Sequence, residues 1–275
     1  MEWIVDIVGP GFAQATQVQD VLFDERSAFQ HIQVASSPLF GRMLILDDAV
    51  QTTERDEYIY HEMLAHLPLL THPAPRRVLI IGGGDGGTLE ETLKHPIERA
   101  TLVEIDQDVV TVCRRFLPFI SGGAFDDVRT RLVIDDGIKF VQTASERFDV
   151  ILVDSTDPKG PGLALFSPEF YAACTRVLAP DGLLVAQSGS LLYQRDLTEM
   201  VRRHLRTAFP VVGTYWAAVP AYPGVLWGFS YGSLRHDPGR VNRDAIGKRL
   251  AKIPTRLYSA DTHAAALQLP GLPDV

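Results

Sequence analysis

A glycine-rich stretch with one carboxylate in its middle is the first place in the sequence where chemistry can be inferred. Gly82 to Gly87 reads GGGDGG, with Asp85 as its only side chain. Glycines serve where the backbone needs a positive φ or where a ligand must come close. The apolar run RVLII precedes the loop and TLEETLKH, which has the character of a helix, follows it. A strand, a glycine turn and a helix start form the nucleotide-binding element of doubly wound sheets.

Acidic residues also end the next two apolar runs. Glu104 stands 22 residues after Gly82, where an acidic side chain can accept hydrogen bonds from both ribose hydroxyls. Asp135, Asp136 and Gly137 end the following run and could reach the amino group of a base. Each residue alone could equally be a helix cap or a turn residue. Together they predict an adenosine site at the ligand-binding edge of an open sheet.

Asp85 limits the kind of nucleotide. In a dry site, a carboxylate close to a pyrophosphate costs several kcal/mol or forces protonation, which disfavours a dinucleotide cofactor. The loop suits an adenosine ligand whose other end is cationic. We therefore expect Gly82, Gly83, Gly84 and Gly86 to shape a site for such a ligand.

The fourth apolar run, FDVILVD, ends in Asp154, and Asp157 follows three residues later. The segment Pro158 to Gly162, which contains Lys159, has the composition of a mobile cover. An Asx-turn at the strand end is the plainer interpretation. Because clustered carboxylates need a neutralising cation and only His61 is available as a nitrogen ligand, we expect an organic polycation and no metal.

The elements that position these residues follow from periodicity. Residues 18–53 alternate in short apolar runs broken by Ser, Gly and Asp-Asp, which predicts a small antiparallel sheet. Residues 54–70 have helical spacing. From residue 76, five apolar runs alternate with helical ones, the rhythm of a doubly wound parallel sheet, and VVGTYWA and VLWGFSYG suit an antiparallel edge. We expect an N-terminal β domain over 1–53 and a Rossmann-like domain over 54–275.

Composition sets further bounds. The 275 residues carry a formal charge of −8, which disfavours nucleic acid as a partner and is permissive for cationic ligands. No apolar run approaches the ~18 residues of a membrane span, and no signal peptide is evident, so we expect a cytoplasmic protein without a membrane partner. Cys113 and Cys174 lie in amphipathic patterns that predict buried free thiols.

The chain resembles the polyamine aminopropyltransferases, and among them bacterial spermidine synthases, from Trp3 to about Gly232. The matching motifs are LDDAVQTTERDEYIYHEM, LIIGGGDGGTLEE, LVEID, VIDDG, DSTDPKGP, VAQSG and VPAYPGVLWGF. The resemblance implies a small N-terminal β domain joined to a methyltransferase-like Rossmann domain. It also implies transfer of an aminopropyl group from decarboxylated S-adenosylmethionine to putrescine, giving spermidine and 5′-methylthioadenosine. The donor is then a co-substrate, with no cofactor or metal, and a homodimer is expected.

The resemblance also assigns roles to individual residues. The residues implied for the donor are Gln30, Asp85, Glu104, Asp136, Gly137 and Pro161. Those implied for the amines are Trp3, His61, Asp85, Asp154, Asp157 and Tyr222. Asp154 would be the proton acceptor, helped by Tyr60 and Tyr222. On sequence alone, Tyr60 and His61 would equally be core residues of their helix.

Charge balance gives a physical reason for this assignment. A sulfonium, its amine and a diamine bring about four positive charges into one cleft, and Asp85, Asp154, Asp157 and Glu62 are the available counter-charges, although Glu62 could simply be solvated on its helix. The attacking amine must lose a proton, because a free alkylammonium has a pKa near ~10.4. Asp85 would also repel the carboxylate of ordinary S-adenosylmethionine.

Three residues depart from the family pattern, and the sequence therefore does not fix which amine is the acceptor. Glu90 replaces a usual Arg and is expected to change surface pairing only; Gly189 stands where some members carry Glu; Ala221 replaces a common Thr or Ser. Cadaverine, agmatine or a longer amine are alternative acceptors. A methyltransferase that uses S-adenosylmethionine and a catalytically silent polyamine-binding or nucleoside-binding protein are the remaining alternatives.

Overall fold

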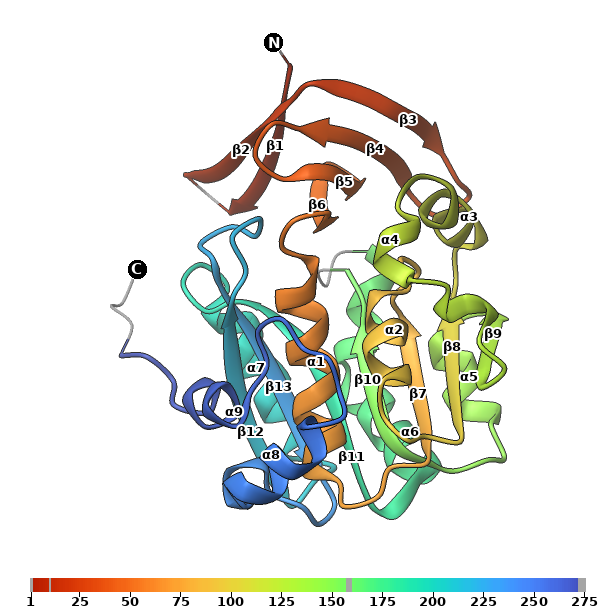
Figure 1. The fold of residues 1–275 in the computed structure, drawn as a ribbon, viewed down its shortest axis with the longest axis vertical. Coiled ribbons are helices and arrows are strands. Elements are labelled where there is room, and N and C mark those ends of the chain that lie inside the picture. Colours follow the sequence, from red (N-terminus) through yellow and green to blue (C-terminus); the bar gives the residue numbers. More distant parts are fainter. Residues whose placement is uncertain (1, 10, 157–159, 272–275) are drawn as a thin grey trace.

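The computed structural model describes residues 2–9, 11–156 and 160–271, which form three sheets and their covering helices (Figure 1). Two N-terminal sheets lie above a layered α/β body. The N-terminal strands are β1 (Glu2–Gly9), β2 (Phe12–Val18), β3 (Asp20–Arg26), β4 (His31–Ser37), β5 (Gly41–Leu46) and β6 (Ala49–Thr53).

The four strands β3 to β6 form the antiparallel sheet that the alternation predicts, in the order β3-β4-β5-β6. Strands β1 and β2 pair separately as a hairpin, which the sequence analysis did not anticipate. Side chains of β1 alternate between the two faces of this hairpin, and Trp3, Val5 and Ile7 share the exposed one. The proposed division at residue 53 stays a prediction.

A seven-stranded sheet forms the centre of the α/β body, in the order β12-β13-β11-β10-β7-β8-β9. Its strands are β7 (Arg77–Gly82), β8 (Arg99–Glu104), β9 (Thr130–Ile134), β10 (Phe148–Asp154), β11 (Leu178–Ser190), β12 (Val211–Ala218) and β13 (Leu226–Ser233). Strands β7 to β11 pair in parallel, whereas β13 is antiparallel to both β11 and β12. The predicted α/β fold and its antiparallel edge are confirmed.

Helices cover both faces of this sheet, and its central strands β7, β8 and β10 are accordingly apolar and buried on both sides. Alternate strand residues pack with α1 and α2 on one face and with α5, α6 and α7 on the other. The helices are α1 (Glu57–Thr71), α2 (Gly87–Leu93), α3 (Gln107–Phe116), α4 (Pro118–Ser121), α5 (Gly137–Thr143), α6 (Pro168–Val177), α7 (Arg195–Leu205), α8 (Arg243–Leu250) and α9 (Ala260–Ala266). Short 3₁₀ turns are η1 (Ala124–Asp126), η2 (Gly160–Phe166) and η3 (Pro238–Arg240).

The N-terminal sheet is tied to the α/β body through its own apolar cluster. Ile32 and Val34 of β4 pack with Val109 and Val112 of α3. Burial of these side chains removes apolar surface from water and joins the two layers. The sheet is thereby held over the carboxyl ends of the parallel strands (Figure 1).

Glu62 on α1 corrects one expectation. Its side chain is fully buried and accepts the backbone N–H groups of Arg256 at 2.5 Å, Leu257 at 2.8 Å and Tyr258 at 2.6 Å. These bonds satisfy the charge inside the protein, so Glu62 does not serve as a counter-charge in the cleft. It anchors the segment between α8 and α9, a region whose sequence pattern was uninformative.

Two other expectations concern thiols and membranes. Cys113 and Cys174 are buried free thiols, as predicted, and burial raises the pKa of both. Within the described part of the chain, none of the helices combines the length and the apolar character that crossing a membrane would require.

Candidate active site

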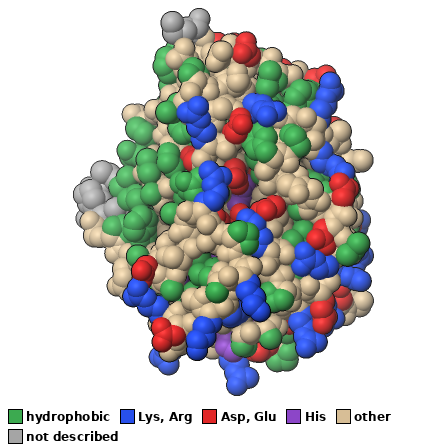
Figure 2. Space-filling model, viewed as in Figure 1, with side chains coloured by type: hydrophobic (Ala, Val, Ile, Leu, Met, Phe, Trp, Pro, Cys, Tyr) green, Lys and Arg blue, Asp and Glu red, His purple; other side chains and the backbone are tan. Residues whose placement is uncertain are grey.

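A cavity of about 310 Å³ opens between the carboxyl ends of the parallel strands and the N-terminal sheets. Strands β7 and β10 lie side by side at its floor, where the chain order reverses: β8 and β9 follow on one side of β7, and β11 lies beyond β10. Ligands of open α/β sheets bind at such a switch point. Figure 2 shows acidic and histidine side chains gathered near the start of α1 on one face of the molecule.

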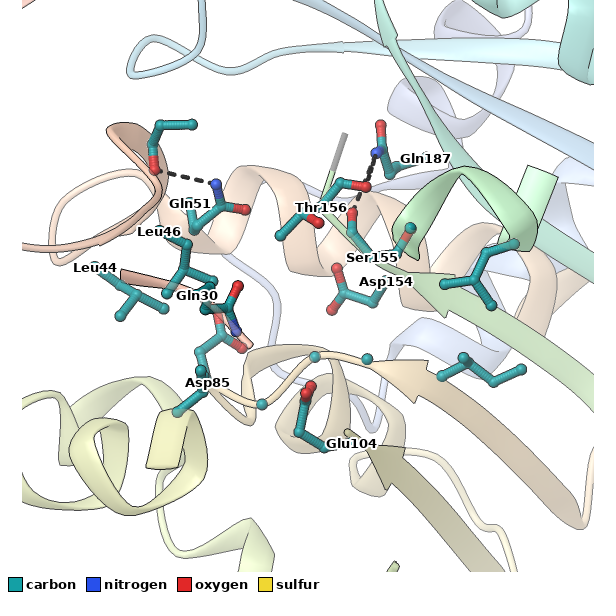
Figure 3. Close-up of a pocket in the computed structure, with 18 of the residues that line it drawn as sticks. Gln30, Leu44, Leu46, Gln51, Asp85, Glu104, Asp154, Ser155, Thr156 and Gln187 are labelled. Atoms are coloured by element: carbon teal, nitrogen blue, oxygen red, sulfur yellow. Dashed lines mark hydrogen bonds between the residues drawn. The ribbon is translucent and has the colours of Figure 1, made fainter. Parts of the chain in front are cut away.

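The cavity brings together most of the residues that the sequence analysis singled out. Figure 3 shows Glu104 and Asp154 directed into a common space, across from Leu44, Leu46 and Gln51 of the N-terminal sheet. The predicted residues that line it are Gln30, Tyr60, His61, Gly82, Gly83, Gly84, Asp85, Glu104, Asp136, Gly137, Asp154 and Tyr222.

The glycine loop can follow its path only without side chains. Gly82 and Gly83 have φ of 81° and 70°, a region that L residues rarely adopt. A Cβ on Gly82 would collide with the carbonyl oxygen of Asp154, and one on Gly83 would lie 2.8 Å from Oδ2 of that residue. The Gly83 N–H donates to the Asp154 carbonyl at 2.9 Å. The loop is thus locked to the end of β10.

Glu104 ends β8 and is fixed by the backbone. Its Oε1 accepts the Asp106 N–H at 2.9 Å, and Asp106 in turn accepts Gln30 Nε2 at 2.9 Å and Ser27 Oγ at 2.6 Å. These bonds tie the end of β8 to the loop between β3 and β4 of the N-terminal sheet. Burial, aided by the nearby Asp106 charge, raises the pKa of Glu104 to about 7.

Asp136 serves as the N-cap of α5 and also lines the cavity. Its Oδ1 accepts the Ile138 N–H at 2.7 Å. A capping carboxylate is held in one orientation by the first turn of its helix. The cap interpretation and the ligand interpretation are therefore compatible.

Asp154 lies at the end of β10 with a hydroxyl on each oxygen. Tyr60 donates to Oδ1 at 2.8 Å and Thr88 donates to Oδ2 at 2.6 Å. Burial and the charge of Asp85 raise the pKa of Asp154, against the opposing effects of His61 and these two hydrogen bonds. Burial also raises the pKa of Tyr60 well above its ordinary value, so its phenol remains a hydrogen-bond donor.

Asp85 lies in the same cluster as Asp154, but its pKa is shifted in the opposite direction. Its Oδ1 accepts the Gly87 N–H at 2.9 Å, and its Oδ2 lies 3.3 Å from His61 Nε2. Burial alone would raise the pKa of Asp85, but the charge and hydrogen bonding of His61 and the Gly87 N–H hold that pKa below its usual value. The pKa values of these two neighbouring carboxyl groups are thus shifted in opposite directions, a division found in acid–base sites.

His61 is buried between two carboxylates. Its Nδ1 lies 2.8 Å from Glu57 Oε2, on the side of the ring away from Asp85. Burial disfavours the imidazolium, yet Asp85 and Glu57 raise the pKa of His61 well above 6.5. Ligand atoms of His61, Asp85 and Asp154 lie within 4.8 Å of one another, a spacing that suits a metal ion as well as an organic ammonium group.

Aromatic rings form the wall next to this cluster. The rings of Tyr60 and Tyr222 meet edge-on with their centroids 5.6 Å apart. The centroids of the Tyr222 and Trp227 rings lie 4.6 Å apart. The Tyr222 hydroxyl donates to the Gln51 carbonyl at 2.6 Å, which joins the loop after β12 to β6. Trp227 Nε1 is buried without a hydrogen-bond partner among the described residues. An apolar wall with a few fixed polar groups is typical of a small-molecule site.

Two predicted site residues lie away from this cavity, and for two others the structure gives no side-chain placement. Trp3 is 52% exposed on β1 and does not line it, and Gly86 faces Ser121 and Phe125 instead. Asp157 lies outside the described residues, as do Pro158 and Lys159 of the expected cover, whereas Gly160 begins η2 and Gly162 lines the cavity. The side chain of Pro161 is likewise not described.

Several lining residues escaped the sequence analysis. Asp6 comes from the unanticipated hairpin, and Gln51 comes from β6. Gln187 donates to the Ser155 and Thr156 carbonyls at 3.1 and 3.3 Å and so shapes the end of β10. Gln187 directly follows the apolar run LLVA, and this position was a usable signal, whereas nothing near Asp6 in the sequence marks it as a site residue.

The three departures have local explanations. Gly189 has φ of 79°, and a Cβ there would lie 2.5 Å from Gln194 Oε1, so a side chain at this position would displace Gln194 from the cavity wall. Glu90 pairs with Lys94 at 2.9 Å and does not line the cavity. Ala221 is held through its backbone: its N–H donates to Asp56 Oδ2 at 2.7 Å, and its carbonyl accepts Gln14 Nε2 at 2.8 Å.

The topology and the cavity define a Rossmann-like α/β protein with a small-molecule site at the switch point of its sheet. A solved spermidine synthase in complex with the transition state analogue AdoDATO has the same fold, with a TM-score of 0.92 and 36% sequence identity. The match covers 98% of this chain and 92% of that one.

Sequence comparisons identify the family. The spermine/spermidine synthase domain matches residues 57–239, and the spermidine synthase tetramerisation domain matches residues 2–54. A polyamine aminopropyltransferase of Desulforudis audaxviator is 45% identical, over 98% of this chain and 96% of its own length. Polyamine aminopropyltransferase 1 of Pseudomonas aeruginosa is 47% identical, over 94% of this chain and 92% of its own length. The chain therefore belongs to the spermidine synthase family of polyamine aminopropyltransferases, which confirms the resemblance.

Proposed function

We propose that this enzyme transfers an aminopropyl group from decarboxylated S-adenosylmethionine to putrescine, with Asp154 as the proton acceptor. The observation that carries the proposal is the buried pair Asp85 and Asp154, which line one cavity with their pKa values shifted in opposite directions. Such a site suits one permanent counter-charge and one base. The names of its relatives and the AdoDATO complex of a structural relative support the same reaction class.

The donor would lie along the strand ends. Glu104 at the end of β8 would accept the ribose hydroxyls, and Asp136 and Gly137 at the start of α5 would lie by the adenine. Asp85 would pair with the amine of the aminopropyl group. Ordinary S-adenosylmethionine carries a carboxylate next to that amine, and the charge of Asp85 would repel it.

The acceptor amine must be neutral when it attacks the carbon next to sulfur. Asp154 lies at the end of β10 beside the Tyr60 and Thr88 hydroxyls, and its raised pKa makes it a stronger base than a solvated carboxylate. The nitrogen–carbon bond forms as the carbon–sulfur bond breaks, the sulfonium becomes a neutral thioether, and the amine proton passes to Asp154. Holding amine and carbon near ~3.5 Å supplies much of the acceleration.

The far end of the diamine would reach the wall opposite Asp154. Asp6 of β1 and Gln51 of β6 line the cavity on the side of the N-terminal strands, and Asp6 would supply a carboxylate for a second ammonium. Chain length would be determined by the distance between Asp154 and Asp6. Putrescine is the proposed acceptor, and cadaverine, agmatine and longer amines are the alternatives that the experiment below distinguishes.

The test is incubation of the enzyme with each donor and a panel of amines, with products identified by mass spectrometry. Methylthioadenosine and spermidine formed only with the decarboxylated donor and putrescine would support the proposal. Demethylated donor would show a methyltransferase, and ligand binding without turnover would show a silent binding protein. Faster turnover of another amine would reassign the acceptor. Asp85→Asn should lower activity with the decarboxylated donor, and unchanged kinetics with both donors would refute the role of Asp85.

We further propose that the chain forms a homodimer through its N-terminal strands. Trp3, Val5 and Ile7 present an exposed apolar row on β1, and the tetramerisation-domain match over residues 2–54 includes that row. Light scattering after size-exclusion chromatography would report a dimer, and a monomer or tetramer would contradict that stoichiometry.

A further inference from the structure

Glu57, which plays no part in the reaction as proposed above, lies one contact away from the reacting cluster. It occupies the first turn of α1, and its side chain is only 13% exposed. One carboxylate oxygen, Oε2, lies 2.8 Å from His61 Nδ1, and the other, Oε1, lies 3.4 Å from Arg256. Residues four apart on a helix share a face, which allows the contact between Glu57 and His61.

His61 has little freedom in this arrangement. Its ring is 2% exposed, and a Cβ on Gly87 would collide with the ring, so the imidazole lies flat against the start of α2. One ring nitrogen faces Glu57, and the other faces Asp85. A ring placed between two carboxylates can satisfy both only when both nitrogens carry protons.

We propose that Glu57 is a positioning residue for the transfer reaction: it keeps His61 doubly protonated and aimed at Asp85, and so fixes the carboxylate that receives the donor amine. This inference rests on the proposed function for its kinetic consequence but not for the state of His61. The charged and titratable groups around His61 are Glu57 on α1, Asp85 on the glycine loop, Asp154 on β10 and the neighbouring Tyr60.

The charges explain why a third carboxylate is useful. Without Glu57, the buried imidazolium would keep only Asp85 as a direct ion-pair partner, and burial would favour release of its proton. A neutral His61 would leave Asp85 and Asp154 as two carboxylates without a cation between them in one buried site. The difference between Asp85 as the counter-charge and Asp154 as the base would then be lost. The raised pKa of His61 and the lowered pKa of Asp85 agree with the intact arrangement.

Arg256 extends the arrangement to the C-terminal segment. Its guanidinium lies over the Tyr58 ring at 3.6 Å and pairs with Glu57, while its backbone N–H is held by Glu62. The segment between α8 and α9 is thereby connected to Asp85 through Glu57 and His61. Because the side chain of Arg256 is 58% exposed, the ion pair between Arg256 and Glu57 contributes less to the position of Glu57 than the ion pair between Glu57 and His61.

The direct test is the protonation state of His61, read from its ring ¹⁵N shifts as pH is varied, in wild type, Glu57→Gln and Glu98→Gln. Glu98 is the matched control, because it pairs with Arg76 on the surface, 61% exposed and away from the cavity. We expect imidazolium in wild type and Glu98→Gln through pH 8, and a midpoint at least one pH unit lower in Glu57→Gln. A neutral wild-type ring at pH 7, or identical titrations, would overturn the proposal.

Kinetics provide the second measurement. Glu57→Gln should lower kcat/KM for the donor about tenfold, as expected for loss of one charge-assisted hydrogen bond, and shift the pH profile with the His61 midpoint. Rates and profile equal to those of Glu98→Gln would also overturn the proposal. If Glu57→Gln does not fold, Arg256→Gln should move the His61 titration in the opposite direction, since it removes a competing cation, and an unmoved midpoint would count against the proposal. If no donor supports turnover, the proposed function fails while the titration still decides the role of Glu57.

Discussion

The two halves of the cavity are built from very different lengths of chain. The half proposed for the donor, here called the donor half, consists of consecutive strand ends, from Gly82 at the end of β7 to Gly137 at the start of α5. The half proposed for the amine, here called the acceptor half, combines Asp6 of β1, Gln51 of β6, and Tyr222 and Trp227 near the start of β13. Parallel strands fix the first half through their own hydrogen bonds, whereas the second depends on contacts between distant segments. We therefore expect donor recognition to be rigid and acceptor choice to be adjustable by few substitutions.

The largest effect is expected where the two halves meet. Asp154→Asn should lower kcat by about 10³-fold, because general-base contributions are typically 10²–10⁴-fold, while donor affinity changes little. Single-turnover kinetics and donor binding by calorimetry would measure both. Asp244→Asn on the exposed side of α8 is the control. A parallel loss of donor affinity would mean that Asp154 belongs to the donor half and does not act on the acceptor amine.

Gly82→Ala tests the rigidity of the donor half. Its positive φ and the collision of a Cβ with the Asp154 carbonyl should lower the free energy of unfolding by about 2–4 kcal/mol and abolish donor binding. Gly247→Ala on α8, where no atom lies within 4 Å, should stabilise the protein by about 0.5–1 kcal/mol. Urea unfolding and donor titration check both variants. Normal donor affinity in Gly82→Ala would show that the loop is less constrained than its geometry indicates.

Glu104→Gln should separate stability from donor binding. The pKa of Glu104 is about 7 in the folded protein and near 4.5 when unfolded, so the folded state binds the extra proton between these values, and the carboxyl lowers stability as pH rises through this window. The variant should therefore be more stable than wild type at pH 8, by up to about 3 kcal/mol, and equal to it at pH 4. Donor affinity should fall about tenfold.

Urea unfolding at the two pH values and calorimetric donor titration measure this pair of effects. Glu90→Gln is the control for affinity, since Glu90 also has a pKa of about 7 but lies outside the cavity. If the stability difference between wild type and Glu104→Gln were the same at pH 4 and pH 8, the Glu104 carboxyl would not be carrying the buried charge.

The smallest effect belongs to the acceptor half. Asp6→Asn should raise KM for the diamine by about three- to tenfold, with kcat and donor KM unchanged, because one partly solvated charge pair is lost. Glu2→Gln on the same strand is the control. Steady-state kinetics with putrescine and a monoamine of similar length would locate the effect, and equal losses for both amines would contradict a role for Asp6 at the distal ammonium.

The difference between the donor half and the acceptor half also explains which cavity residues could be predicted from the sequence. Gly82, Glu104 and Asp136 were predictable because each ends an apolar run, and the ends of parallel strands must meet at one edge. Asp6 was not, because the hairpin that carries it pairs only with itself and reaches the cavity through tertiary packing. Glu62 was misjudged as a counter-charge, since its partners are backbone groups almost 200 residues away.

The bridge at Ala221 constrains how the molecule is made. Its two backbone bonds, to Asp56 and Gln14, span 165 and 207 residues. Contacts so distant in sequence form late, because the cost of closing the intervening loop must be met first. A nascent chain that has not yet released Ala221 from the ribosome also lacks Tyr222 and Trp227, so the growing polypeptide passes through a stage in which the strand ends from Gly82 to Gly137 exist but one side of the cavity is missing.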